Sequence, residues 1–163
     1  MPNCHYRKKI LAPKYQIDDT DRKILKELTK DGRVSFLEIA QKLNVSGGTI
    51  HQRVNKMKLA GVIKGFIPVL EKQQLGLEIS AMIGVHLKNA KDCGAVLEKL
   101  NRFPEVFEAH YTTGTYALIV KVSTTSMPEF HSFLIDKLQS ISEIQSTESF
   151  ICLSTPIEKN IKF

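Results

Sequence analysis

Three short amphipathic helices are predicted by the hydrophobic pattern in the first third of the chain. The segment Asp18-Asp19-Thr20-Asp21 precedes the first stripe with helix-capping residues, and Ser35 and Ser46 precede the second and third stripes as N-cap candidates. Only residues 44–46 separate the second predicted helix from the third, and Asn44 suits a left-handed turn. Two helices joined this closely are typical of a helix-turn-helix, or more generally of a helical hairpin. The stripes have the spacing of one helix face: Ile24, Leu25 and Leu28; Ile39, Ala40 and Leu43; Ile50, Val54 and Met57.

Beyond residue 76 the pattern changes to alternating strand-like and helix-like segments. Strands are predicted at 81–87, 106–112, 116–122 and 147–153, and helices at 90–102 and after Ser126. The order βαββαβ is typical of a ferredoxin-like fold. In that fold helices cover one face of the sheet, so we expect the other face to pair with a second copy of the chain.

The predicted fold class is therefore α+β, with two domains. An all-α, winged-helix-like helix-turn-helix domain precedes a ferredoxin-like βαββαβ sandwich domain. Residues 62–69 are also strand-like, which suggests a connecting strand. The expected boundaries are a flexible N-terminal arm at 1–15, the helix-turn-helix domain at 16–66, a linker strand at 67–76 and the sandwich domain at 77–163.

Charge is divided unevenly between the two parts of the chain. Residues 1–75 contain 15 Lys and Arg against 7 Asp and Glu, whereas residues 76–163 contain 8 against 10. A basic first half suggests that only this half faces a polyanion. No apolar run reaches the roughly 18 residues of a membrane span, and the three cysteines fit neither a disulfide framework nor a zinc site. We expect a cytoplasmic, nucleoid-associated protein without membrane contact.

The third predicted helix presents a polar and basic outer face that suits double-stranded DNA. Gln and Asn side chains pair with adenine edges, Arg pairs with guanine, and the Thr methyl group contacts thymine. Basic side chains at the end of this helix suit phosphates, which add affinity without sequence information. The candidate DNA-binding residues are Ser46, Gly48, Thr49, His51, Gln52, Arg53, Lys56 and Lys58.

Several separate motifs, in order and spacing, resemble the Lrp/AsnC (feast/famine) family of transcriptional regulators. They are the segment 18–25 with its paired aspartates, the Asp31-Gly32-Arg33 triplet and the step at 61–65. Within this family the chain is most similar to the asparagine-responsive branch, through segments 48–51, 54–58, 111–114 and 143–148. The resemblance implies a sequence-specific regulator of amino-acid metabolism that binds palindromic operators.

The resemblance also implies what the second domain does. It implies homodimers built on the sheet, four of which associate into an octamer, and an amino-acid effector bound between dimers, here L-asparagine. A glycine-containing turn offers backbone N–H groups to a carboxylate, and neutral side chains suit an amide. The effector-binding residues implied by the resemblance are Tyr111, Thr112, Thr113, Gly114, Thr115, Tyr116 and Gln139.

Three alternatives stay open at this point. The chain could answer another amino acid, or none, and act as an architectural DNA-binding protein. A more remote alternative is an Lrp-like sirohaem decarboxylase, but a polycarboxylate substrate needs clustered cations. The second domain has one arginine, Arg102, and scattered histidines. We therefore expect no enzyme, no catalytic residues, no metal and no cofactor besides the effector.

Overall fold

The structure is a computed structural model that describes residues 15–159 and 161 of the chain. The chain divides into two compact units, one containing the described residues 15–69 and the other Leu70–Pro156. Each unit has its own hydrophobic core. The expected arm at 1–15 lies almost entirely outside the described residues.

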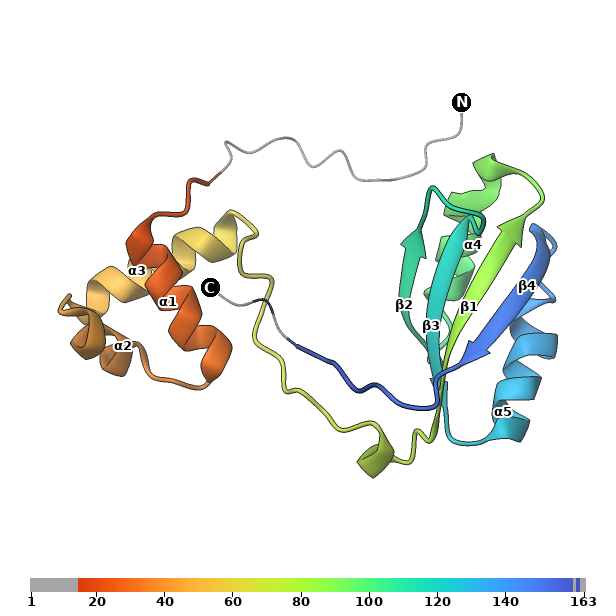
Figure 1. The fold of residues 1–163 in the computed structure, drawn as a ribbon. Helices are drawn as coiled ribbons and strands as arrows, with labels where there is room; N and C mark the ends of the chain where they lie inside the picture. Colours follow the sequence, from red (N-terminus) through yellow and green to blue (C-terminus); the bar gives the residue numbers. More distant parts are fainter. Residues whose placement is uncertain (1–14, 160, 162–163) are drawn as a thin grey trace. The chain divides into compact units, whose positions relative to one another are not determined.

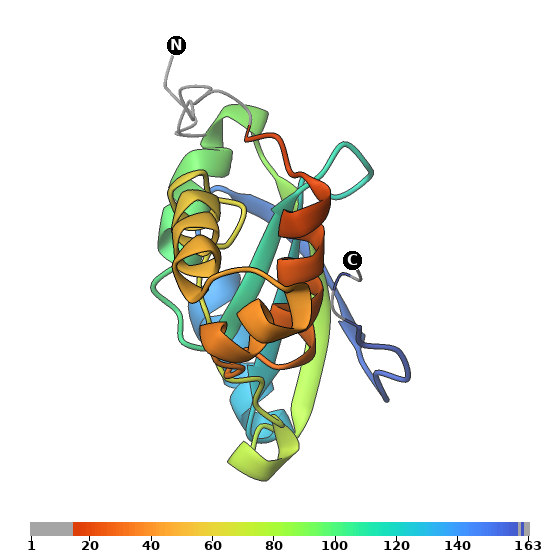
Figure 2. The same ribbon diagram turned by 90° about the vertical axis from the view of Figure 1, so that its left-hand side faces the viewer.

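The first unit consists of three helices, α1 (Asp19–Lys30), α2 (Phe36–Leu43) and α3 (Gly47–Leu59). They pack against one another, and the linker leaves from the C-terminal end of α3 (Figures 1 and 2). The predicted N-caps Ser35 and Ser46 are confirmed. Within the predicted capping segment 18–21 the N-cap is Asp18, which forms a reciprocal capping box with Asp21. Asn44 has the predicted left-handed conformation, with φ 57°. Every residue of the three predicted stripes is buried except Leu43, which is half-buried.

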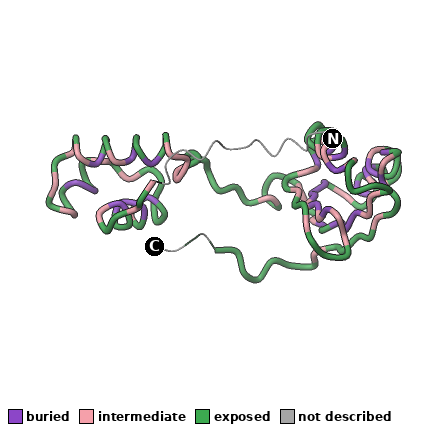
Figure 3. Tube along the Cα trace, turned by 90° about the horizontal axis from the view of Figure 1, so that it is seen from above, coloured by how far each residue is buried: buried purple, intermediate pink, exposed green. Residues whose placement is uncertain are grey.

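The strand expected at 62–69 is not formed, and neither is a linker strand at 67–76. Residues 64–71 are exposed (green in Figure 3), and within 67–76 the only regular element is the short 3-10 helix η1 (Gln73–Leu75). Ile67 and Val69 are 86% and 88% exposed. A strand needs a hydrogen-bonded neighbour, and this apolar run has none within the part of the chain that the structure describes.

The second unit is a four-stranded antiparallel sheet with helices on one face. Its strands are β1 (Ile79–Leu87), β2 (Val106–Tyr111), β3 (Leu118–Thr124) and β4 (Ile144–Ile151), in the order β2-β3-β1-β4. The helices are α4 (Cys93–Leu100), preceded by η2 (Ala90–Asp92), and α5 (Met127–Ser132), which continues as the π-helix η3 (Phe133–Leu138). This is the predicted βαββαβ ferredoxin-like arrangement.

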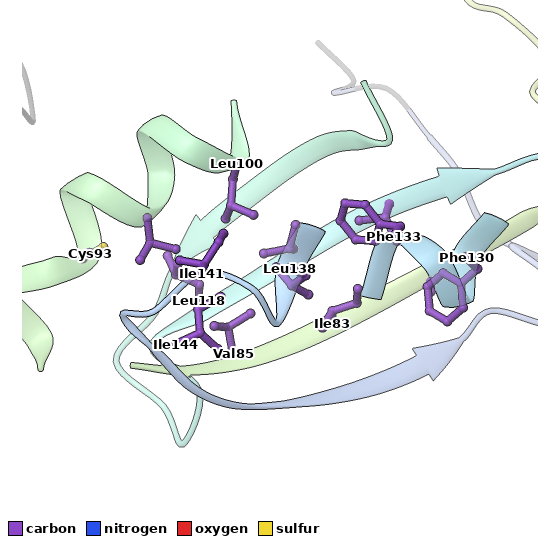
Figure 4. Close-up of a cluster of buried hydrophobic side chains, with 14 residues drawn as sticks. Ile83, Val85, Cys93, Leu100, Leu118, Phe130, Phe133, Leu138, Ile141 and Ile144 are labelled. Carbon is purple, nitrogen blue, oxygen red and sulfur yellow. The ribbon is translucent and has the colours of Figure 1, made fainter. Parts of the chain in front are cut away.

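The core of this unit lies between the sheet and its helices. Ala81, Ile83 and Val85 of β1 belong to this core. Figure 4 shows Ile83 and Val85 together with Phe133 and Leu138 of the π-helix. The residues between them on β1 therefore face the other side of the sheet, which we call the open face.

β4 begins three residues before its predicted start, because it is an edge strand whose mostly exposed residues lack a clear hydrophobic alternation.

Candidate nucleic-acid interface and effector site

Helix α3 exposes a polar face opposite its buried stripe. A turn of 100° per residue puts Gly48, Gln52 and Asn55 on the side away from the core, and all three are exposed. The neighbouring Lys56 is exposed as well. This surface has the amide and basic side chains that suit the DNA major groove.

The N-terminal turn of α3 is fixed by its cap. The Ser46 hydroxyl accepts a hydrogen bond from the Thr49 backbone N–H at 3.1 Å and lies 2.9 Å from the Thr49 hydroxyl. Two other predicted DNA-binding side chains contact neighbouring rings. His51 packs edge-on against Phe36, with ring centroids 5.9 Å apart, and the ammonium of Lys58 lies 5.0 Å from the ring centroid of Phe66.

Arg53, expected to contact guanine, instead forms an ion pair inside the first unit. Its Nη1 lies 2.7 Å from Oδ2 of Asp18 and 3.0 Å from Oδ1 of Asp21. The guanidinium donates to both carboxylates, which raises the pKa of Arg53. The pKa of Asp18 is lowered, first by the backbone N–H of Asp21 and then by Arg53. The two carboxylates at the start of α1 therefore bind the Arg53 side chain, which does not extend from the outer face of α3.

The predicted effector residues lie on two different faces of the sheet. Tyr111 pairs with the buried Leu118 of β3, so it lies on the helix-covered side at the end of β2. Tyr116 lies on the open face, over Gly84. The turn between them exposes Thr113, Gly114 and Thr115, whereas Thr112 is half-buried and donates a hydrogen bond to the backbone carbonyl of Tyr116.

Gln139 follows the π-helix, and its amide nitrogen lies 3.3 Å from the hydroxyl of Thr147 on β4. Thr147 and Tyr111 share one cross-strand row of the sheet, with Leu118 and Val85 between them. Three strand spacings put Tyr111 and Thr147 about 14 Å apart. Within one chain, Gln139 and Tyr111 therefore lie at opposite edges of the sheet and do not form a single pocket.

Sequence reasoning missed a cluster around Tyr116 on the open face. The Tyr116 ring lies 5.1 Å from that of His86 and 6.3 Å from that of Phe150, measured between centroids. Its hydroxyl donates to Glu148 of β4, which raises the pKa of Tyr116. Gly84, a glycine inside a strand pattern, was the one available signal of this close approach.

The remainder of the open face combines apolar and polar groups. Met82, Phe107 and Phe150 are each about half exposed. At one end, the ammonium of Lys72 lies 4.5 Å from the ring centroid of Phe107 and donates to the hydroxyl of Ser123. Half-exposed apolar side chains on an uncovered sheet suit a protein interface better than solvent.

Comparison with known proteins identifies both units. Residues 17–64 match the winged helix-turn-helix DNA-binding model, and residues 80–161 match the Lrp/AsnC ligand binding domain. The regulatory protein AsnC of Haemophilus influenzae is 47% identical over 148 residues, which cover 91% of this chain and 99% of the relative.

Solved structures agree with these matches. The Escherichia coli AsnC structure is 45% identical, covers 90% of this chain and 99% of its own, and superposes with a TM-score of 0.86. A transcriptional regulator from Neisseria meningitidis in complex with L-Met is 26% identical, with a TM-score of 0.81 and coverages of 88% and 94%.

The chain belongs to the Lrp/AsnC family of transcriptional regulators, with a helix-turn-helix DNA-binding domain and a ligand-binding domain. Its AsnC relatives are named as regulatory proteins rather than as enzymes. In the described residues no helix is long and apolar enough to cross a membrane, and no cluster of three or more His, Cys, Asp or Glu side chains suits a metal ion.

Proposed function

We propose that this chain is a sequence-specific regulator of amino-acid metabolism that binds palindromic DNA as a dimer or higher oligomer and responds to L-asparagine. The observation that carries the DNA-binding part is the outer face of α3. Gln52 and Asn55 are exposed there beside Lys56, on a helix anchored by three buried apolar residues. We also propose the domain boundaries that the sequence predicts, with the difference that the linker does not form a strand.

The proposed DNA contacts divide into two groups. Gly48, Thr49 and Gln52 lie on or beside the outer face of α3 and suit base edges and close backbone approach. The remaining residues lie at the margins of this face and suit phosphate contacts. These are Ser46, His51, Lys56 and Lys58. The Arg53 side chain is bound to Asp18 and Asp21, so we propose that Arg53 affects DNA binding through the position of α3 and does not contact DNA itself.

The open face of the sheet is the proposed dimer interface. Pairing two such faces would bury Met82, Phe107 and Phe150, which are otherwise left in water. An isologous contact also gives a two-fold axis, which presents two copies of α3 to a palindromic site. Four such dimers would form the proposed octamer.

The effector site is proposed to be completed by a second chain. Tyr111 and Gln139 lie at opposite edges of one sheet, so a compact amino-acid site holding both needs edges from two molecules. The exposed 113–115 turn would receive the carboxylate, and the amide of Gln139 would pair with an amide side chain. The L-Met complex of the Neisseria relative supports an amino-acid effector, but it does not indicate which amino acid this chain binds.

Two experiments test this proposal. In the first, the full-length protein selects duplexes from a random pool, and the selected sequences should converge on a dyad-symmetric consensus. An unchanged pool would contradict sequence-specific binding. In the second, isothermal titration against the twenty common amino acids should give the largest heat with L-asparagine. Heat with leucine or methionine alone would reassign the effector.

A further inference from the structure

Arg53 is the only arginine of α3, and its side chain projects from the side of the helix that borders the buried stripe. At 100° per residue it lies about 60–70° from the centre of the buried stripe and about 100° from Gln52. Its side chain is only 29% exposed. A base-contacting arginine would instead be expected on the outer face, beside Gln52.

The two acids that hold Arg53 are also the two members of the α1 capping box, and their oxygens are divided between the two tasks. Asp18 uses Oδ1 to accept from the Asp21 backbone N–H at 2.8 Å, and Asp21 uses Oδ2 to accept from the Asp18 N–H at 3.3 Å. Arg53 binds the other oxygen of each carboxylate. The Tyr15 hydroxyl also donates to Oδ2 of Asp21, at 2.9 Å. Each of the four carboxylate oxygens therefore accepts at least one hydrogen bond.

Asp21 makes this arrangement difficult to break, because its side chain is 1% exposed. If Arg53 swung away to a base, the buried carboxylate would lose its cation. Leaving a buried charge without its partner generally costs more free energy than one base contact returns. The ion pair is therefore expected to persist when DNA is bound.

We propose that Arg53 is a positioning residue of the DNA interface. Its bonds to Asp18 and Asp21 fix the rotation of α3 about its own axis against the start of α1. That rotation determines the direction in which Gln52 and Lys56 meet the DNA. The inference rests on the proposed function, DNA binding by the outer face of α3.

Asp18→Asn separates positioning from direct contact. The asparagine keeps an oxygen to cap α1, but its –NH₂ group cannot accept from Arg53. The probes are the consensus duplex enriched by the wild-type protein and a scrambled duplex of equal composition. The readout is the ratio of the two affinities, measured by fluorescence anisotropy well below the melting temperature of every variant.

We expect Asp18→Asn to lower this ratio about tenfold, even though it removes a negative charge that repels DNA. Arg53→Ala should lower the ratio at least as much, because it also removes the bond to Asp21. The double variant should lose no more than Arg53→Ala alone, because the bond between Arg53 and Asp18 is already absent in that variant. Asp19→Asn is the matched control. It removes the same charge from the exposed neighbouring residue and should leave the ratio unchanged.

Two results would overturn the inference. If Asp18→Asn tightens consensus binding while Arg53→Ala loses preference at a single base pair, Arg53 contacts a base. If both variants unfold more easily but keep the wild-type ratio, the ion pair only stabilises the fold. Failure of the wild-type protein to enrich any consensus is a failure of the proposed function. In that event, hydrogen exchange of the α3 amides in the free protein tests the restraint on α3 by itself. Asp18→Asn should accelerate this exchange and Asp19→Asn should not, and equal exchange rates in wild type and Asp18→Asn would overturn the restraint.

Discussion

Gly84 of β1 lies directly beneath the ring of Tyr116. A Cβ built on Gly84 would stand 2.5 Å from Cδ1 and 2.6 Å from Cγ of that ring, closer than real Cβ atoms approach. The ring is held from its other end as well, because its hydroxyl donates to Glu148 on β4. Tyr116 therefore connects the turn after β2 to the far edge of the sheet across the open face.

Gly84→Ala should destabilise the second unit, because Cγ of Tyr116 is close to the backbone and the whole turn must move to relieve the overlap. Overpacking of this kind costs about 1–3 kcal/mol. Urea unfolding measures the loss. In a Tyr116→Ala background the same substitution should cost little. An equal loss in both backgrounds would mean that the two residues do not interact.

Met82→Glu should weaken the proposed dimer, since it puts a charge in the middle of the open face. Ile135→Glu is the matched control, because Ile135 is 49% exposed and Met82 43%, but Ile135 lies on the π-helix, away from the open face. Sedimentation velocity should show that Met82→Glu dissociates at concentrations where the control stays associated. Unchanged association of Met82→Glu would place the dimer interface elsewhere.

Glu27 should make the stability of the first unit depend on acid pH. Hydrogen bonds from Lys42 and then Lys30 lower the pKa of Glu27 from its usual 4.5 to about 2. A lowered pKa means that the folded state favours the charged carboxylate. The stabilisation is complete above pH 4.5 and is lost as the pH falls through about 2. The side chains of Lys30 and Lys42 are mostly exposed, so solvent screens both ion pairs and the effect is small.

Thermal unfolding of wild type and Glu27→Gln, followed by circular dichroism, measures this dependence. The wild-type protein should melt at the higher temperature at pH 7, and the difference should disappear as the pH approaches 2. Glu71→Gln, in the exposed linker, is the control. A difference that stays constant from pH 7 to pH 2 would show that the ion pairs do not stabilise the fold.

Gln139→Ala should weaken effector binding about tenfold, the equivalent of one good hydrogen bond. Ser149→Ala is the control, because Ser149 lies on β4 two residues beyond Thr147 and on the same face. Titration calorimetry with L-asparagine should show weaker binding for Gln139→Ala only. Equal affinities for the wild-type protein and Gln139→Ala would exclude the amide of Gln139 from the site.

The elements of both units were predictable because their signals are local. N-caps at Asp18, Ser35 and Ser46 mark helix starts through hydrogen bonds within one turn. The helix-turn-helix and the βαββαβ order followed from hydrophobic periodicity, because each element buries only one face. The strand expected at 62–69 was wrong, since strand-like residues form a strand only when another strand is available to pair with them.

The side-chain partners were harder to predict because they depend on distant parts of the chain. Nothing in residues 46–59 indicates that Arg53 is held by carboxylates more than thirty positions earlier. Likewise, Tyr111 and Tyr116 are close in sequence, but strand alternation and the intervening turn put them on opposite faces of the sheet. Such outcomes depend on how elements pack, which periodicity does not describe.

The outer face of α3 is proposed to recognise DNA sequence. The most direct test of this proposal is the ratio of affinities for the selected consensus duplex and for random duplex, measured at physiological salt with wild type and Gln52→Ala. We predict a ratio of at least about 10³ for the wild-type protein and a loss of about tenfold or more in Gln52→Ala, with binding to random duplex unchanged. A wild-type ratio near one, with binding that depends only on salt, would contradict the claim and indicate an architectural DNA-binding protein.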